Sequence, residues 1–210
     1  MRTGIILLAG GRSLRLGRNK LGEVLEGESL LHRSLRPLLP LGQVWVVGDG
    51  RPLELPPGVR LVADLLPGRG PMGGVFTGLL ASPSYYSLVV ACDMPFLKPE
   101  LLRYLLRAAS GYDLALPRVQ DKVEPLHAVY SRNCLAPLRH LLAEGYTSLL
   151  ELLPRVKVRY VEERELRSAD PHLLSLFNVN TQEDLEKARS LLAGAKEARQ
   201  PPQLEGRGTP

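Results

Sequence analysis

A glycine turn followed by four cations is the segment of this chain best suited to chemistry. The apolar residues 5–9 lead into two glycines and then a run of cations with no intervening acid, namely Gly10, Gly11, Arg12, Arg15, Arg18 and Lys20. Glycine adopts backbone conformations closed to other residues, so the main chain can approach a ligand and direct its N–H groups at it. This combination predicts a loop that binds a polyphosphate; the alternative is a basic surface loop without a ligand.

The loop matches neither of the two best-known phosphate-binding motifs. A P-loop requires Gly-Lys followed by Ser or Thr, whereas Gly17 is followed by Arg18, and Lys20 by Leu21. A dinucleotide fingerprint does occur as a string over residues 68–73, with Asp93 beyond it. Residues 64–67 separate that string from the preceding strand, however, and a proline lies inside it. The pattern therefore argues against a dinucleotide-dependent oxidoreductase.

Two aspartates follow segments that read as buried strands. Asp93 lies between the apolar run 88–92 and a proline, and Asp64 follows the run 59–63. A single carboxylate beside nucleotide phosphates is a common way to hold Mg²⁺, which keeps most of its waters. Asp93 is therefore a candidate metal ligand; the alternative is that it caps the helix expected from Lys98 or a turn.

Near the end of the chain, Asn178 and Asn180 occupy alternate positions just before an expected helix. Extended backbone would point both carboxamides to one side. They are candidates to orient a phosphate or a metal-bound water, and ordinary turn chemistry is the alternative.

Composition indicates a single globular domain. The chain has 210 residues, of which 44% are hydrophobic, and its formal net charge is +5. Only 5% are aromatic, and the densest basic stretch coincides with the glycine loop, so anionic small molecules are better partners than nucleic acid. The two cysteines and four histidines have no zinc spacing, and we expect no zinc. With no signal-like or membrane-spanning run, a cytoplasmic enzyme is expected.

Strand-like and helix-like segments alternate along the chain. Strands are expected near residues 4–8, 44–47, 59–63, 88–92, 113–116, 127–130 and 156–161, and helical segments near 29–39, 74–81, 98–109, 134–143, 148–153 and 181–192. This order predicts one Rossmann-like three-layer α/β domain over residues 1–193, with a mainly parallel twisted sheet. Residues 194–210, rich in Pro, Gly and charge, are expected to form a disordered tail. The glycine loop and Asp93 then face one crevice at the carboxyl ends of the strands.

With these pieces in order, the chain resembles the molybdenum cofactor guanylyltransferase (MobA) family of nucleotidyltransferases. The resemblance covers nearly all of residues 5–192 and rests on the segments LAGGRSLRLGRNK (8–20), GPMGG (70–74), CDMP (92–95) and FNVNT (177–181), with a further similar stretch at 125–130. It implies transfer of GMP from Mg²⁺-GTP to the terminal phosphate of molybdopterin, with release of pyrophosphate. Transient contact with cofactor-synthesis proteins or a recipient molybdoenzyme would suit that activity.

The resemblance also implies roles for single residues. Leu8, Ala9 and Gly10 would present backbone groups to guanine and ribose, and Gly11 would help to cradle the phosphates. The charged side chains would act on the triphosphate: Lys20 would contact it, Arg15 would neutralise the leaving pyrophosphate, Asp64 would lie at the nucleotide and Asp93 would bind Mg²⁺. Asn178 and Asn180 would line the molybdopterin side.

One position departs from the family pattern. Where the family often has a nucleotide-contacting Asn, this chain reads Val47-Gly48-Asp49. That contact is then missing, supplied by Asp49 or made through backbone.

Two other functions are consistent with the same motifs. A relative that uses CTP, including a cytidylyltransferase for the same cofactor or for another small phosphate acceptor, usually reads LAAG where this chain reads LAGG. Gly10 in place of alanine would let a purine lie closer to the backbone and so favours GTP. A non-catalytic nucleotide-binding protein is the other alternative, against which Lys20 and Asp93 argue. Because a phosphate acceptor is already an anionic nucleophile, the chemistry requires positioning and charge neutralisation rather than a Ser, Cys or His base.

Overall fold

The computed structural model describes residues 3–9 and 22–197. Its strands are β1 (Gly4–Leu8), β2 (Val24–Leu25), β3 (Glu28–Ser29), β4 (Gln43–Gly48), β5 (Arg60–Ala63), β6 (Tyr86–Ala91), β7 (Leu114–Val119), β8 (Lys122–Val123), β9 (His127–Ser131) and β10 (Val158–Glu162). Its α-helices are α1 (Leu30–Leu35), α2 (Gly70–Ala81), α3 (Pro99–Ala108), α4 (Leu135–Ala143), α5 (Glu163–Ala169) and α6 (Gln182–Glu197). Short 3₁₀ helices cover Leu39–Leu41, Arg132–Cys134, Leu149–Arg155 and Leu174–Leu176. None of the helices in the described part of the chain is long and apolar enough to cross a membrane.

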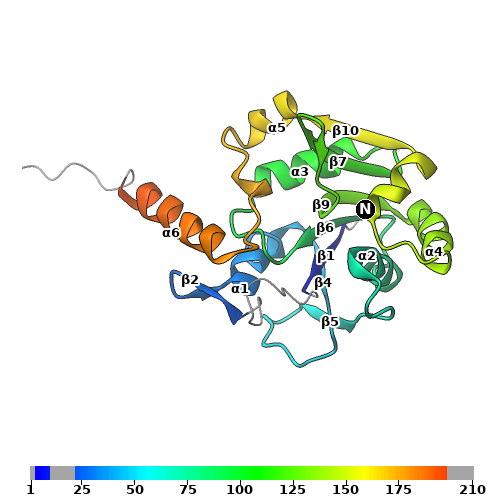
Figure 1. Ribbon diagram of the computed structural model, residues 1–210, viewed down its shortest axis with the longest axis horizontal. Helices are drawn as coiled ribbons and strands as arrows, with labels where there is room; N and C mark the ends of the chain where they lie inside the picture. The colour runs from blue at the N-terminus through cyan, green and yellow to red at the C-terminus, as the bar shows by residue number, and fades with distance from the viewer. Residues whose placement is uncertain (1–2, 10–21, 198–210) are drawn as a thin grey trace, which may run out of the picture.

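The main sheet has the strand order β10-β7-β9-β6-β1-β4-β5, with β8 paired to β7. The pairs β1–β4, β1–β6, β4–β5 and β7–β10 are parallel, whereas β9 runs antiparallel to both of its neighbours. The predicted mainly parallel sheet is therefore confirmed (Figure 1). The antiparallel direction of β9 places its first residue, His127, at the edge where β1 and β6 end.

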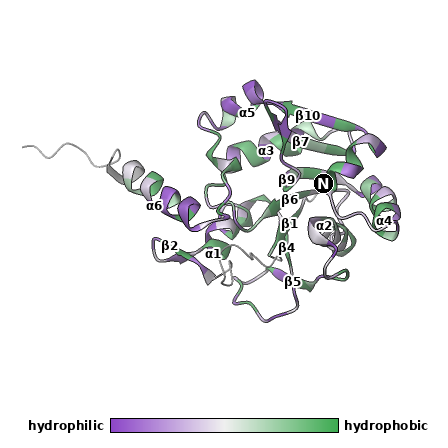
Figure 2. Cartoon of the chain, in the orientation of Figure 1, coloured by the Kyte–Doolittle hydropathy of each residue, from purple (hydrophilic) through white to green (hydrophobic). Residues whose placement is uncertain are grey.

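The sheet lies between two helical layers, as predicted. Alternate side chains of β1 serve opposite faces: Ile5 and Leu7 pack with α1, α3 and α5, and Ile6 and Leu8 pack with α2 and α4. Figure 2 shows hydrophobic residues concentrated in the central strands, while α5 carries many hydrophilic ones. A smaller cluster packs α6 against the β2–β3 hairpin and α1 through Leu25, Leu30, Val179, Leu185 and Ala188.

Three helices differ in extent from their predicted ranges. The Ser29 side chain caps α1 as expected, but the helix ends at Leu35 rather than near Leu39 because Pro37 has no N–H to donate to the Arg33 carbonyl. The second helix begins at Gly70, four residues early, since Pro71 fits a first turn whose N–H groups need no intrahelical partner.

The last helix is longer than predicted and runs to Glu197. Ala193 and Ala195 are strong helix formers, and the Gly194 between them costs only about 1 kcal/mol. Residues 194–197 are therefore helical. The disordered tail predicted for residues 194–210 stays a prediction from 198 onward, outside the described residues.

Candidate active site at the carboxyl edge of the sheet

The carboxyl ends of four parallel strands meet at one edge of the sheet. Beyond the last paired residues, Cys92 N donates to Leu8 O (3.1 Å), Ala9 N donates to Val47 O (2.8 Å) and Asp64 N donates to Gly48 O (2.7 Å). The segments that follow β1, β4, β5 and β6 are thus tied to one another (Figure 1). Ligands of open α/β sheets bind at this edge.

Part of the predicted site falls in residues 10–21, outside the described residues. Gly10, Gly11, Arg15 and Lys20 belong to that segment, and their predicted roles stay predictions. Leu8 and Ala9, immediately before it, are buried. The Leu8 carbonyl and the Ala9 N–H described above both bond within the sheet, so any contact of this turn with a base or ribose stays a prediction as well.

Asp93 lies in a turn whose backbone is held from several elements. The Ser34 hydroxyl of α1 donates to Cys92 O (3.0 Å) and to Met94 O (3.2 Å), and Val179 N donates to Asp93 O (2.9 Å). Asp93 itself is half-buried. The structure does not support the alternative that it caps α3, because Lys98 is the N-cap residue and no side chain caps that helix. Its carboxylate is thus carried on a rigid turn at the ligand-binding edge.

Asp64 has a structural task at the end of β5. Its Oδ1 accepts hydrogen bonds from Leu66 N (3.0 Å) and from the Thr77 hydroxyl of α2 (2.9 Å). These bonds fix the turn that leads into α2. Asp49, at the end of β4, is exposed, and its Oδ2 lies 3.0 Å from Arg51 Nε. The structure thus pairs Asp49 with Arg51, and all three explanations for the missing family Asn stay predictions.

Two glycines of the GPMGG segment have a packing role. A Cβ placed on Gly73 would lie 2.9 Å from the Leu66 carbonyl oxygen, and one on Gly74 would lie 3.3 Å from Leu8 Cδ2. Both distances are shorter than ordinary van der Waals contact. These glycines let α2 approach the turn after β5 and the end of β1, which shapes the edge of the sheet.

The two asparagines lie on either side of a buried valine. Val179 is fully buried, Asn178 is half-buried and Asn180 is exposed. The backbone N–H groups of Asn180 and Thr181 both donate to Asp184 Oδ2, and the Thr181 hydroxyl accepts from Asp184 N (3.1 Å). The predicted hydroxyl cap of the last helix is confirmed. Asn178 lies next to Asp93 through the Val179–Asp93 backbone bond.

Sequence reasoning missed Glu124, which the structure brings to the same place. Its Oε2 accepts from Asn178 Nδ2 (3.3 Å) and its Oε1 from Leu126 N (3.0 Å). Burial raises the pKa of Glu124 above its ordinary value, and the Asp93 charge raises it further, although the bonds from Leu126 and Asn178 oppose both effects. Its position directly before the family-like stretch 125–130 was the one available signal.

A small cavity of about 200 Å³ adjoins this cluster. It is lined by Pro117, Val119, Lys122, Val123, Glu124, Leu173 and Leu176. Apart from Lys122 and Glu124 the lining is apolar, so the cavity can receive an apolar or ring-shaped group beside the Glu124 carboxylate.

The oxygen donors at this edge fit a hard divalent cation. Asp93 supplies a carboxylate, and among the described residues no group donates a hydrogen bond to the buried Oδ1 of Asn178. Mg²⁺ prefers such oxygens and usually takes few from the protein. In the same ranges, 3–9 and 22–197, no group of three or more His, Cys, Asp or Glu side chains is arranged to hold a metal.

His127 begins β9 behind the Asp93 turn and is fully buried, with its Nδ1 3.4 Å from Met94 Sδ. Burial lowers its pKa to about 4, an effect only partly opposed by the Asp170 charge. At neutral pH the ring is uncharged and packs in the core.

We expect this histidine to make the fold sensitive to acid. Its pKa in the folded state lies below the unfolded value near 6.5, so the unfolded chain binds more protons and stability falls as pH drops from about 6.5 to about 4. The loss should be about 3 kcal/mol by pH 4. In urea unfolding, the free energy of unfolding of His127→Gln should fall by about 3 kcal/mol less than that of the wild type between about pH 6.5 and pH 4. The exposed His172, changed to Gln in the same way, should leave the pH dependence of the wild type unchanged. Parallel declines in all three proteins would contradict the assignment.

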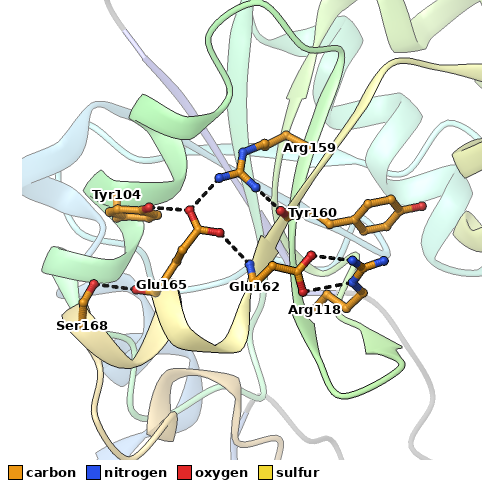
Figure 3. A network of polar contacts seen from close by, with 7 residues as sticks. All are labelled: Tyr104, Arg118, Arg159, Tyr160, Glu162, Glu165 and Ser168. Carbon is orange, nitrogen blue, oxygen red and sulfur yellow. Dashed lines mark hydrogen bonds and ion pairs between the residues drawn. The ribbon is translucent and has the colours of Figure 1, made fainter.

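A second polar network braces the far side of the same edge (Figure 3). It comprises Tyr104, Arg118, Arg159, Tyr160, Glu162, Glu165 and Ser168. Glu165 Oε1 accepts from the Tyr104 hydroxyl (2.8 Å) and from Arg159 Nη2 (2.6 Å), and its Oε2 accepts from Glu162 N (3.0 Å). The bond to Glu165 raises the pKa of Tyr104. These contacts hold the junction between β10 and α5 in place. We therefore assign the network a structural role.

Comparison with known proteins identifies the family of this chain. The MobA-like NTP transferase domain family matches residues 5–160. The probable molybdenum cofactor guanylyltransferase of Pelotomaculum thermopropionicum is 38% identical over 94% of this chain and 96% of its own length. The molybdenum cofactor guanylyltransferase of Desulfosudis oleivorans is 34% identical over 92% and 97% of the two chains.

A crystal structure agrees with these relatives. That of molybdopterin-guanine dinucleotide biosynthesis protein A from Archaeoglobus fulgidus is 29% identical, with a TM-score of 0.80, over 91% of this chain and 99% of that one. The resemblance inferred from four short segments is confirmed. The chain belongs to the family of MobA-like NTP transferase domains.

Proposed function

We propose that this protein transfers GMP from Mg²⁺-bound GTP to the terminal phosphate of molybdopterin, which releases pyrophosphate and forms the guanine dinucleotide form of the cofactor. The family membership makes the chain a nucleotidyltransferase. The observation that carries the specific reaction is the 38% identity, over nearly the whole of both chains, to a protein named a probable molybdenum cofactor guanylyltransferase.

On the GTP side of the proposed site, the residues would hold Mg²⁺ and the triphosphate in fixed positions. The Asp93 turn, held by Ser34 and Val179, would present its carboxylate to Mg²⁺ at an unchanging position. When bound there, Mg²⁺ would supply positive charge to the triphosphate. Arg15 and Lys20 would stabilise the charge that develops on the departing pyrophosphate, which is electrostatic catalysis in a prearranged site. The acceptor phosphate is itself the nucleophile, and holding it in line with the α-phosphorus lowers the barrier further.

The acceptor side is proposed at Asn178, Asn180 and the neighbouring cavity. The cavity is largely apolar, and its lining also includes one cation, Lys122, and one carboxylate, Glu124. The apolar part suits a ring system, and Lys122 would pair with a phosphate that the ring carries. Contacts with cofactor-synthesis proteins or a molybdoenzyme, and a cytoplasmic location, stay predictions from the sequence.

The test is a nucleotide panel. With Mg²⁺ present, GTP should raise the melting temperature more than CTP or ATP, because a ligand that binds only the native state stabilises it by mass action. Gly10→Ala should weaken the GTP effect, since a methyl group would intrude where the base approaches. Gly194→Ala is the matched control, because a Cβ there meets nothing within 4 Å.

Two results would count against guanylyl transfer. Equal stabilisation by CTP would favour the cytidylyl alternative. GTP binding without pyrophosphate release, with molybdopterin supplied, would favour a non-catalytic nucleotide-binding protein.

A further inference from the structure

Glu124 is a half-buried residue whose backbone and side chain both form hydrogen bonds. It follows β8, and its backbone N–H donates to Pro117 O (3.1 Å) while its carbonyl accepts from His127 N (3.3 Å). Its side chain accepts a second backbone bond, from Leu126 N to Oε1 (3.0 Å). Because this partner is a main-chain donor, Oε1 has a fixed role and Oε2 is the atom left for a side chain.

That side chain is Asn178, which lies 54 positions further along the sequence. Glu124 Oε2 accepts from Asn178 Nδ2 (3.3 Å). A carboxamide has one donor end and one acceptor end, so a bond to Nδ2 determines where the oxygen lies. The Oδ1 of Asn178 is buried, and within the described ranges no donor reaches it. A buried carbonyl oxygen without a donor destabilises the folded protein, so an amide left in this orientation requires a reason.

The neighbouring Asp93 can explain this orientation of the Asn178 amide. The backbone bond between Val179 N and Asp93 O (2.9 Å) ties the residue after Asn178 to the proposed metal ligand. Two oxygens of the kind preferred by Mg²⁺, one charged and one neutral, then belong to adjoining segments.

We propose that Glu124 is a positioning residue: by accepting from Nδ2 it orients the Asn178 carboxamide so that Oδ1, on the segment bonded to the Asp93 turn, is available to the cation or to a water bound to it. The inference rests on the proposed role of Asp93 in binding Mg²⁺. Outer partners of this kind typically change metal affinity about 10- to 100-fold when they are replaced.

One substitution at Glu124 should turn the Asn178 carboxamide around, so that its oxygen and its NH₂ group exchange places. In Glu124→Gln, the fixed Leu126 N–H takes the single side-chain oxygen, and the new NH₂ group points at Asn178. The Asn178 carboxamide should then turn its oxygen toward the introduced glutamine and its NH₂ group toward Asp93. Adding Asn178→Asp restores an oxygen on both sides, because a carboxylate accepts from the glutamine and still offers its second oxygen. Asn178→Asp alone would instead place two carboxylates in contact.

The experiment measures Mn²⁺ binding in the presence of GTP by the EPR signal of free Mn²⁺, with folding checked by circular dichroism. Glu124→Gln should weaken Mn²⁺ binding at least about 10-fold, and the double variant should recover most of the loss. Glu162→Gln, which removes the same charge at the same sheet edge, should bind Mn²⁺ as the wild type does. Wild-type affinity in Glu124→Gln, or no recovery in the double variant, would overturn the proposal.

The Asp93→Asn variant distinguishes a failure of the proposed Glu124 role from a failure of the proposed metal site. Loss of Mn²⁺ binding in Asp93→Asn together with normal binding in Glu124→Gln would refute the positioning role and leave the metal site intact. Unchanged binding in Asp93→Asn would refute the metal site and the pairing with Asn178 together.

Discussion

Asp93→Asn is expected to lower Mg²⁺-dependent turnover at least about 100-fold while the protein stays folded, because in the proposed site it removes a prearranged charge at the reacting triphosphate. The fold should survive since the turn is held through backbone atoms, by the Ser34 hydroxyl and by Val179 N, rather than by the aspartate side chain alone. Pyrophosphate release from GTP in the presence of molybdopterin measures the turnover, and thermal unfolding measures the fold.

Two further aspartates serve as controls for this result. Asp121→Asn makes the same charge change in the exposed turn before β8 and should leave turnover unchanged. Asp64→Asn should chiefly lower stability, because Oδ1 of Asp64 joins the turn after β5 to Thr77. Near-normal turnover in a folded Asp93→Asn protein would show that the metal is held elsewhere, with Asp64 the first residue to test.

Arg15→Ala and Lys20→Ala should each lower kcat and kcat/KM together, by about 100-fold. If these cations stabilise the charge on the departing pyrophosphate, their contribution grows as the reaction approaches the transition state, and its loss appears in the chemical step. Steady-state kinetics with GTP as the varied substrate and saturating molybdopterin separates kcat from KM.

Arg18→Ala is the matched control for these two variants, since Arg18 lies between them and the family resemblance gives it no role. Its effect should be smaller. An equal rise in KM for all three variants, with kcat unchanged, would mean that the loop attracts GTP by diffuse charge and that no single cation acts in the reaction.

Much of the fold follows from short-range patterns in the sequence. β1 occupies the predicted residues 4–8, because a continuous apolar run is suited to a strand covered on both faces. The caps at Ser29 and Thr181 are also local, since each hydroxyl bonds a backbone group three residues away. The position of Asp93 at a sheet edge follows as well, because the apolar run 88–92 predicts a buried strand and Pro95 prevents that strand from continuing far beyond Asp93.

Tertiary structure alone decided the arrangement around that aspartate. The direction of β9 depends on its neighbours in the sheet, and no periodicity in residues 127–131 distinguishes a parallel from an antiparallel strand. The bond between Glu124 and Asn178 is likewise invisible in the sequence, because a hydrogen bond over 54 positions exists only once the β7–β8 hairpin and the segment before α6 meet. Local chemistry thus predicted candidate residues for binding a nucleotide and a metal, whereas long-range packing determined that Glu124 and Asn178 lie together beside the Asp93 turn.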